Sequence, residues 1–439
     1  MKKFYTFLLL AMVTLPFITL AQKSWQEVGQ GGFSEGEAYN QNIAVIGTTP
    51  YVAYVDIAYE DKGTVMKFSD GNWTPVGSPG FTGPALDFDF AASNGILYVA
   101  YVDYDGMLSV MSNEGGGWNY LGAQNFAEVG SISLSVDDGA VYVAFEDADY
   151  EGRISVKKLG NGWEYVGTPG FSTESSAINI NMAAHNGNVY VVYRDSDYNY
   201  KATVMKFDGE VWSVLGNQGF TGGTYDSYKG ITIKDGQPYV VGWNSSTQVT
   251  VYTFAGSSWE TVGGEGISAG HGIYSSIYSS PAGDLYVAYS DEGNEKKIFL
   301  KKFNSGAWEP VGNAVSKLSG TDISIATDES GKPYVAYRDN WYTRRTTVMV
   351  YDESSGVISP GNSDEVSVYP NPTSGKFFID LGIKGQAMGL EVMNSTGQLV
   401  LSDKSSSGQL DLSQLNDGVY FVRINTGNKS VVKRVVIER

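Results

Sequence analysis

The sequence contains no cysteine and only two histidines among its 439 residues. Disulfide bonds, thiolate metal sites and cysteine nucleophiles are therefore excluded. His185 and His271 are far apart in the chain, so a histidine metal cluster is not expected. After the N-terminus, no segment approaches the ~20 continuous apolar residues of a membrane-spanning helix, and no transmembrane anchor is expected.

Basic residues are also scarce, since 30 lysines and arginines face 48 aspartates and glutamates, giving a net charge of -18. The acidic surplus lies in residues 22–365, because the segments on either side are net basic. An acidic body repels the phosphates of nucleic acid. Nucleic acid is therefore not an expected partner.

The first 21 residues have the features of a secretory signal peptide. Lys2 and Lys3 form a basic start, residues 7–17 are mostly apolar, and small residues precede Gln22. The run is too short to span a membrane comfortably. We expect cleavage after residue 21 and export of the mature chain.

Two markers repeat seven times in the body of the chain. A tryptophan followed by a Val-Gly or Leu-Gly pair recurs every 45 to 49 residues, and a tyrosine opens a β-rich run in step with it. The tryptophans are Trp25, Trp73, Trp118, Trp163, Trp212, Trp259 and Trp308. Agreement of two independent markers indicates a structural repeat rather than chance similarity.

Each repeat has the composition of four short strands separated by turns. Asn94-Gly95 and Asp138-Gly139 are examples of the tight hairpin turns that precede the tyrosine run. Helical periodicity is lacking, and 54 glycines argue against long helices. The pattern predicts an all-β protein with a seven-bladed β-propeller over residues 22–352.

The phase of the repeat predicts how the ring closes. Trp25–Val28 corresponds to a fourth strand, whereas the last repeat stops after its third strand at Thr347–Tyr351. The N-terminal strand is therefore expected to complete the last blade, which removes exposed sheet edges. The repeat tryptophans and the Gly-Phe pairs such as Gly170-Phe171 are expected to serve packing, because they occur in most blades.

A polar segment at 353–365 is typical of a linker, and a second domain is expected at 366–439. Its short alternating strands, with turns at Pro370-Asn371-Pro372 and Asn394–Gly397, predict a small Ig-like β-sandwich. The motifs are Val368–Lys376, Leu390–Gly397, Leu412–Leu415, Gly418–Arg423 and the basic ending Lys433-Arg434.

This ordered set of motifs resembles the type A C-terminal sorting domain of the type IX (Por) secretion system of Bacteroidetes. The resemblance implies that residues 366–439 engage the type IX machinery. It also implies a protein that is secreted or held on the outer cell surface, with the tail usually removed.

The loops after the tyrosine strands carry the candidate ligand-binding residues. They combine carboxylates with aromatic rings and share one face of the predicted propeller. The first Asp of each loop is expected to cap its own turn. The candidates are Tyr59, Asp103, Tyr104, Asp147, Tyr150, Asp195, Tyr198, Trp341 and Tyr342.

Three functional classes remain open. Aromatic rings beside carboxylates suit glycan binding, and the same residues suit a protein-contact face. A polysaccharide-processing glycosidase or lyase, or a structural surface protein without a small ligand, are the alternatives. No cofactor is expected, although Asp147, Asp149 and Glu151 resemble the start of a calcium loop without its later bidentate carboxylate. A binding protein is favoured over an enzyme.

Overall fold

The computed structural model describes residues 24–172 and 178–352 of the body. In the tail it describes residues 367–369, 371, 373–380, 389–394, 398–403, 409–426 and 429–438. The expected signal peptide, the linker and most of the turn at 394–397 lie outside these residues. Two compact units result, one formed by Lys23–Asp352 and one that contains the tail.

The strands of the described body form four-stranded antiparallel meanders, two of which join into one eight-stranded sheet and one of which gains a fifth strand. Each four-stranded meander is called a sheet here. The first four sheets contain β2 (Ala38–Ile46), β3 (Thr49–Asp56), β4 (Lys62–Ser69) and β5 (Asn72–Pro75); β6 (Ala85–Ser93), β7 (Ile96–Asp103), β8 (Met107–Ser112) and β9 (Asn119–Tyr120); β10 (Ala127–Asp137), β11 (Ala140–Asp147), β12 (Arg153–Leu159) and β13 (Trp163–Tyr165); β14 (Ile178–His185), β15 (Asn188–Asp195), β16 (Lys201–Phe207) and β17 (Trp212–Val214).

The remaining sheets contain β19 (Ile231–Lys234), β20 (Gln237–Trp243), β21 (Val249–Ala255) and β22 (Ser258–Thr261); β23 (Gly272–Ser279), β24 (Leu285–Asp291), β25 (Lys297–Asn304) and β26 (Ala307–Pro310); and β27 (Gly320–Thr327), β28 (Pro333–Asp339) and β29 (Arg345–Asp352) with β1 (Ser24–Glu27). An extra strand, β18 (Ser227–Lys229), precedes β19. The helical elements are the short 3-10 turns η1 (Ile57–Tyr59), η2 (Glu114–Gly116), η3 (Ala148–Tyr150), η4 (Ser196–Tyr198), η5 (Glu292–Asn294) and η6 (Asn340–Tyr342).

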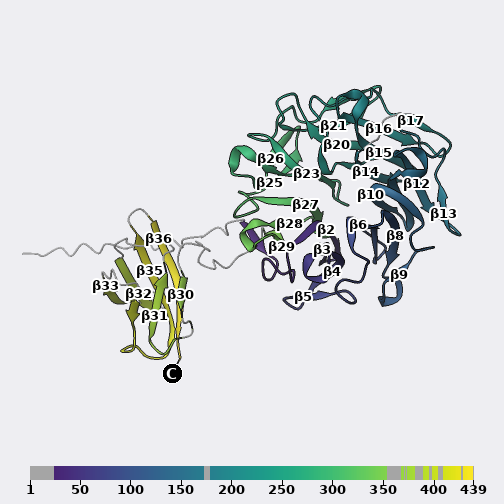
Figure 1. Ribbon diagram of the computed structural model, residues 1–439. Coiled ribbons are helices and arrows are strands. Elements are labelled where there is room, and N and C mark those ends of the chain that lie inside the picture. Colours follow the sequence, from purple (N-terminus) through teal and green to yellow (C-terminus); the bar gives the residue numbers. More distant parts are fainter. Residues whose placement is uncertain are drawn as a thin grey trace, which may run out of the picture. The chain divides into compact units, whose positions relative to one another are not determined.

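The sheets are arranged around a common centre (Figure 1). Their first strands lie innermost, and each contacts the first strand of the next sheet, from β2 through β27 and back to β2. The second strands are buried on both faces, because neighbouring sheets pack against each side. Both faces of these strands therefore carry mainly apolar and tyrosine side chains. This arrangement is that of a β-propeller.

The strand β1 joins the two ends of the body. It pairs with β29 in antiparallel register, with Trp25 opposite Tyr351 and Glu27 opposite Met349. β1 is therefore the fourth strand of the sheet that contains β27, β28 and β29.

The seven repeat tryptophans link each sheet to the preceding one. Each indole Nε1–H donates a hydrogen bond of 2.7 to 3.0 Å to the carbonyl oxygen of the Val or Leu in the preceding repeat's Val-Gly or Leu-Gly pair. In this series the Trp25 indole donates to the carbonyl oxygen of Val311, which belongs to the Val-Gly pair at the C-terminal end of the body. The glycine after the carbonyl is required, since a Cβ at Gly263 (φ +69°) would lie 2.7 Å from the Trp308 ring.

The Gly-Phe pairs pack as the sequence predicts. Phe33, Phe81, Phe171 and Phe220 stack on the tryptophan of the adjoining repeat, with ring centroids 3.7 to 4.2 Å apart and planes within 13°. Stacked rings of this size dominate the buried area between sheets. The core of the body therefore lies between the sheets.

The described tail contains two antiparallel sheets. One has β30 (Ser367–Tyr369), β31 (Lys376–Asp380) and β34 (Gln409–Asp411), and the other has β32 (Gly389–Asn394), β33 (Leu399–Asp403), β35 (Gly418–Thr426) and β36 (Lys429–Ile437). A single apolar cluster that includes Ile379, Leu410, Val392 and Val422 is drawn from both sheets. The two sheets of the tail therefore share one apolar core.

Candidate functional site

The loops after the second strands are capped by aspartates, as expected. The carboxylate of Asp147 accepts a hydrogen bond from the Asp149 N–H at 3.2 Å, and that of Asp195 from the Asp197 N–H at 3.1 Å. Asp103 accepts from the N–H groups of Asp105 and Met107. These aspartates therefore stabilise their own turns.

Four of the predicted aromatic residues share a second structural contact. Tyr59, Tyr150, Tyr198 and Tyr342 each end a 3-10 turn and pack on a glycine with positive φ. A Cβ on these glycines would lie within 2.9 Å of the tyrosine Cβ; they are Gly80, Gly170, Gly219 and Gly32. The close contact gives these tyrosines a packing role that the sequence did not indicate.

Two other candidates are more exposed. Tyr104 is 55% exposed and donates a hydrogen bond of 2.6 Å to Asp61 of the neighbouring sheet. Trp341 is 47% exposed, with the Lys317 ammonium 5.4 Å from its ring centroid. The nine predicted residues are distributed over five sheets, and their role in binding stays a prediction.

The predicted calcium ligands do not converge. The Asp147 carboxylate also accepts a hydrogen bond from the Tyr165 hydroxyl at 3.0 Å, while Glu151 lies at the surface beside Arg153. Within the described parts of the chain, no group of three or more His, Asp or Glu side chains is placed to hold a metal ion.

The strongest candidate site is a pocket of about 370 Å³ at the centre of the body. Residues from the inner strands β2, β6, β10, β14, β23 and β27 and from the segment 226–229 that contains β18 line it: Asn40, Asp87, Phe88, Asp89, Ser131, Ile132, Ser133, Asn179, Ile180, Asn181, Asp226, Ser227, Tyr228, Lys229, Ile273, Tyr274 and Asp322. Most of these residues are polar. The volume is within the range of small-molecule sites.

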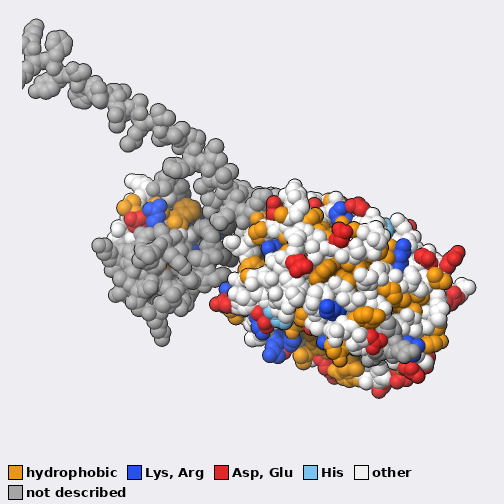
Figure 2. All heavy atoms as spheres, turned by 90° about the horizontal axis from the view of Figure 1, so that it is seen from above, with side chains coloured by type: hydrophobic (Ala, Val, Ile, Leu, Met, Phe, Trp, Pro, Cys, Tyr) orange, Lys and Arg blue, Asp and Glu red, His pale blue; other side chains and the backbone are white. Residues whose placement is uncertain are grey.

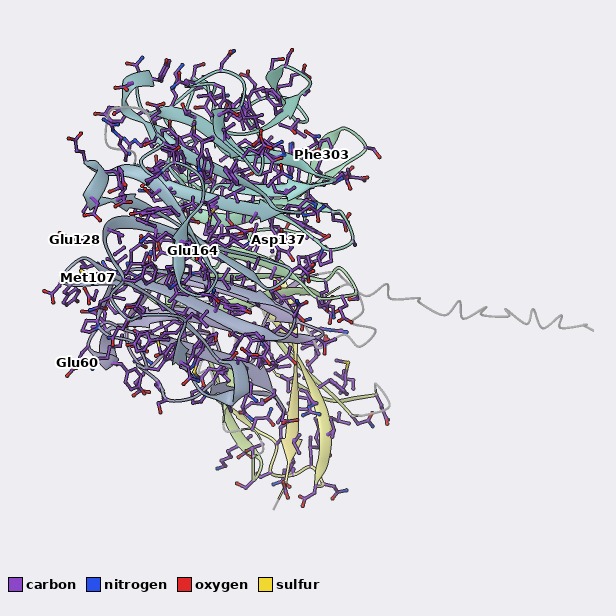
Figure 3. The ribbon with its side chains drawn as sticks, turned by 90° about the vertical axis from the view of Figure 1, so that its right-hand side faces the viewer. Glu60, Met107, Glu128, Asp137, Glu164 and Phe303 are labelled. Carbon is purple, nitrogen blue, oxygen red and sulfur yellow. The ribbon has the colours of Figure 1, made fainter. Side chains whose placement is uncertain are left out.

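The pocket lies toward the face that carries the 3-10 turns η1, η3, η4, η5 and η6. In the sheet register, Ala85 at the start of an inner strand is opposite Asp103, and Gly320 is opposite Asp339. Figure 3 shows Glu60, Met107 and Glu128 on this side of the body and Asp137 and Phe303 toward the other. The predicted loop residues therefore lie around the same end of the body's central axis as the pocket.

A bulge in each of several inner strands turns side chains toward the axis. The register shifts at Asn40, Asn179, Tyr274 and Asp322, and all four have φ between 51° and 56°. Bulges of this kind redirect side chains next to binding sites. Asn and Asp tolerate positive φ, but a tyrosine in this conformation is unusual.

The short strand β18 crosses the centre of the body. It leaves its own sheet and pairs in parallel with β23 of the next sheet. The Tyr228 hydroxyl donates to the Gln41 carbonyl oxygen at 3.1 Å, and the Lys229 ammonium contacts the Asp89 carboxylate. β18 thus ties the fifth repeat to the first and second repeats across the axis.

The pocket is acidic. Four carboxylates, of Asp87, Asp89, Asp226 and Asp322, line it together with one cation, Lys229. Burial, reinforced by the neighbouring Asp89 charge, raises the pKa of Asp87 to about 6, although N–H groups of Ile132 and Phe88 donate to it. Burial also raises the pKa of Asp322, and the Arg338 charge opposes that shift.

Sequence reasoning missed this pocket, although a signal was present. The first strands carry polar residues two apart where the second strands are apolar, as in Asn40 and Asn42, Asp87 and Asp89, Ser131 and Ser133, and Asn179 and Asn181. A period of two places such residues on one face of a strand. In a propeller, the inner strands carry that face toward the axis.

In the tail, the side chains of Asn371 and Thr373 form hydrogen bonds to the backbone. Asn371 donates to the Arg434 carbonyl oxygen and accepts from the Val436 N–H, both at 2.8 Å. The buried Thr373 hydroxyl donates to the Lys376 carbonyl oxygen at 2.6 Å. Asn371 is thereby fixed against β36.

A family model for secretion system C-terminal sorting domains matches residues 367–438. The tail is a type IX sorting domain. This domain indicates export to the cell surface or secretion, in agreement with the resemblance noted in the sequence. No helix among the described residues has the length and apolar character to cross a bilayer.

No curated protein matches the chain. Among solved structures, the SapL1 lectin in complex with α-methyl fucoside is 16% identical, with a TM-score of 0.44 and coverage of 66% of this chain and 100% of the lectin. The six-bladed lectin of Aleuria aurantia is 18% identical, with a TM-score of 0.43 and coverage of 64% and 97%. AofleA from Arthrobotrys oligospora is 10% identical, with a TM-score of 0.42 and coverage of 66% and 88%. Similarity this weak gives no information about the ligand of the present protein.

Proposed function

We propose that the protein is an exported seven-bladed β-propeller, closed by β1, that binds a glycan through its central pocket and the loop face around it. The pairing of β1 with β29 and the bond from Trp25 to Val311 support closure. The sorting domain supports a ligand outside the cell.

The observation that carries the binding proposal is the composition of the pocket. Its carboxylates, amides and hydroxyls both accept and donate hydrogen bonds, which matches the mixed donor and acceptor character of sugar hydroxyls. Tyrosine rings add apolar surface with a polar edge. Its volume of about 370 Å³ favours one or two sugar units over an extended chain.

On the side of the body in view in Figure 2, acidic, basic and apolar side chains are interspersed. A mixed surface of this kind keeps an exported protein soluble. The pocket, with the exposed Tyr104 and Trp341 in the surrounding loops, therefore forms the proposed glycan-binding face.

The test is an array of immobilised mono- and oligosaccharides, probed with the purified protein, with Ser131→Phe and with Trp341→Ala. Ser131 lines the pocket and is half-buried, so a phenyl ring there fills the space available to a ligand. We expect the wild-type protein to bind a defined set of glycans and Ser131→Phe to lose at least about tenfold in affinity, with the melting temperature retained.

The Trp341→Ala variant tests whether glycan binding depends on the loops as well as on the pocket. Loss of binding only in Trp341→Ala would move the glycan site to the loop face alone. Absence of binding to every glycan would contradict the proposed function and favour a protein-contact or structural role. Release of shortened products from a bound polysaccharide would favour the glycosidase or lyase alternative.

A further inference from the structure

Tyr274 departs from the repeat at a position that lines the central pocket. It lies at the bulge of β23, is 39% exposed, and has a φ of +52°. Asn40, Asn179 and Asp322 have the same conformation at the bulges of other inner strands. Their short polar side chains tolerate it, whereas a tyrosine there costs on the order of 1 kcal/mol.

The strand β18 holds this strained segment in place. Ser227 is opposite Ser275, the residue after Tyr274, and their hydroxyl oxygens are 2.9 Å apart. Both serines are buried. Strained backbone persists where the surrounding structure fixes it from more than one side. The pairing with β18, found in this sheet alone among the described sheets of the body, supplies that support.

The ring of Tyr274 is available to a ligand in a way that the other aromatic rings of the pocket are not. Phe88 is buried at 3% exposure, and the Tyr228 hydroxyl is engaged by the Gln41 carbonyl oxygen. Two departures from the repeat, the positive φ of a tyrosine and the displaced β18, thus meet at one exposed ring. Neither departure is needed to form a blade, because the other sheets lack both.

We propose that Tyr274 is the specificity-determining stacking platform of the pocket, which selects pyranosides that present an unbroken C–H face. The apolar face of the sugar lies on the phenol ring, while its hydroxyls bond to the polar side chains around it. This inference rests on the proposed glycan binding. It adds which residue selects the sugar and by which face.

The test uses Tyr274→Asn and Tyr274→Phe in the full chain on the same glycan array, with melting curves recorded in parallel. Asparagine is the residue that two other blades have at the equivalent bulge, so it removes the ring and relieves the strain together. We expect Tyr274→Asn to bind the wild-type glycans about tenfold more weakly, while its melting temperature is equal or about 2 °C higher. Tyr274→Phe keeps the stacking surface and is expected to stay within about threefold of wild type.

The outcomes distinguish this inference from the proposed function. Wild-type affinity in Tyr274→Asn, together with weakened binding in Ser131→Phe, would leave a glycan pocket but overturn the stacking role. A lower melting temperature in Tyr274→Asn would also overturn it, because the tyrosine would then be a packing residue. A wild-type protein that binds no glycan contradicts the proposed function itself.

Discussion

The Asp87 carboxyl is placed where its charge is unfavourable. Asp89 on its own strand and Glu146 on β11 face it with like charge, while Lys229 on β18 and the N–H groups of Ile132 and Phe88 oppose the shift. Its pKa of about 6 exceeds the ~3.9 of an unfolded aspartate, so the folded state holds this proton more tightly. The contribution of Asp87 to stability is therefore greatest below about pH 4 and is lost as the pH rises through 6.

Asp87→Asn removes this titration. We expect the melting temperature of the variant relative to wild type to rise by about 4 °C between pH 4 and pH 7, which corresponds to about 2 kcal/mol. Calorimetry at four pH values measures the difference, and other groups cancel because both proteins contain them. Asp70→Asn, in an exposed hairpin turn, is the matched control. A difference that is constant with pH would contradict the assignment.

Single residues also differ in how well the sequence predicted them. The tryptophans and the Gly-Phe pairs were predictable because each recurs at a fixed place in the repeat, and a recurrent aromatic residue serves the blade. The contact of Lys229 with Asp89 joins residues 140 positions apart and occurs once. Tyr274 gave no signal, because its positive φ follows from a bulge and from β18, neither of which the local sequence specifies.

At the level of elements, β1 is an example of a strand that the repeat pattern could place, and β18 is an example of one that it could not. The phase of the repeat predicted the place of β1, since a fourth strand was missing at one end of the body and present at the other. β18 was not expected, because the repeat predicted four strands in each unit and β18 is an additional one. Its parallel pairing with β23 depends on contacts across the axis with Gln41 and Asp89, which no repeat pattern contains.

Deletion of residues 24–30 tests the closing role of β1. The deletion exposes the edge of β29 and removes both the Trp25–Tyr351 ring contact and the indole bond to Val311. Loss of a packed tryptophan and a ladder edge costs about 3 to 5 kcal/mol, so we expect the melting temperature to fall by about 10 °C. A chain that lacks only residues 1–23 is the control and is expected to melt as the body does with β1 in place. Equal melting of the two chains would show that β1 does not close the ring.

At the scale of the whole molecule, the candidate binding site and the sorting domain belong to different compact units. The central pocket and its loops belong entirely to the unit formed by Lys23–Asp352, and the sorting domain belongs to the other unit. Each unit has its own apolar core, as the clusters of the tail and of the sheets show. Removal of one unit should therefore leave the fold of the other intact.

A chain that ends at residue 365 tests this division in a Bacteroidetes host with a type IX system. We expect it to remain inside the cell, with its surface or culture-medium level reduced at least about tenfold, because the domain at 367–438 is absent. The purified truncated protein is expected to melt at the wild-type temperature and to bind the same glycans, since the pocket is unchanged. A reporter fused to residues 353–439 behind a signal peptide is the reciprocal arm and should be exported. Wild-type export of the truncated chain would show that the tail is dispensable, whereas loss of its glycan binding would show that the pocket depends on the tail.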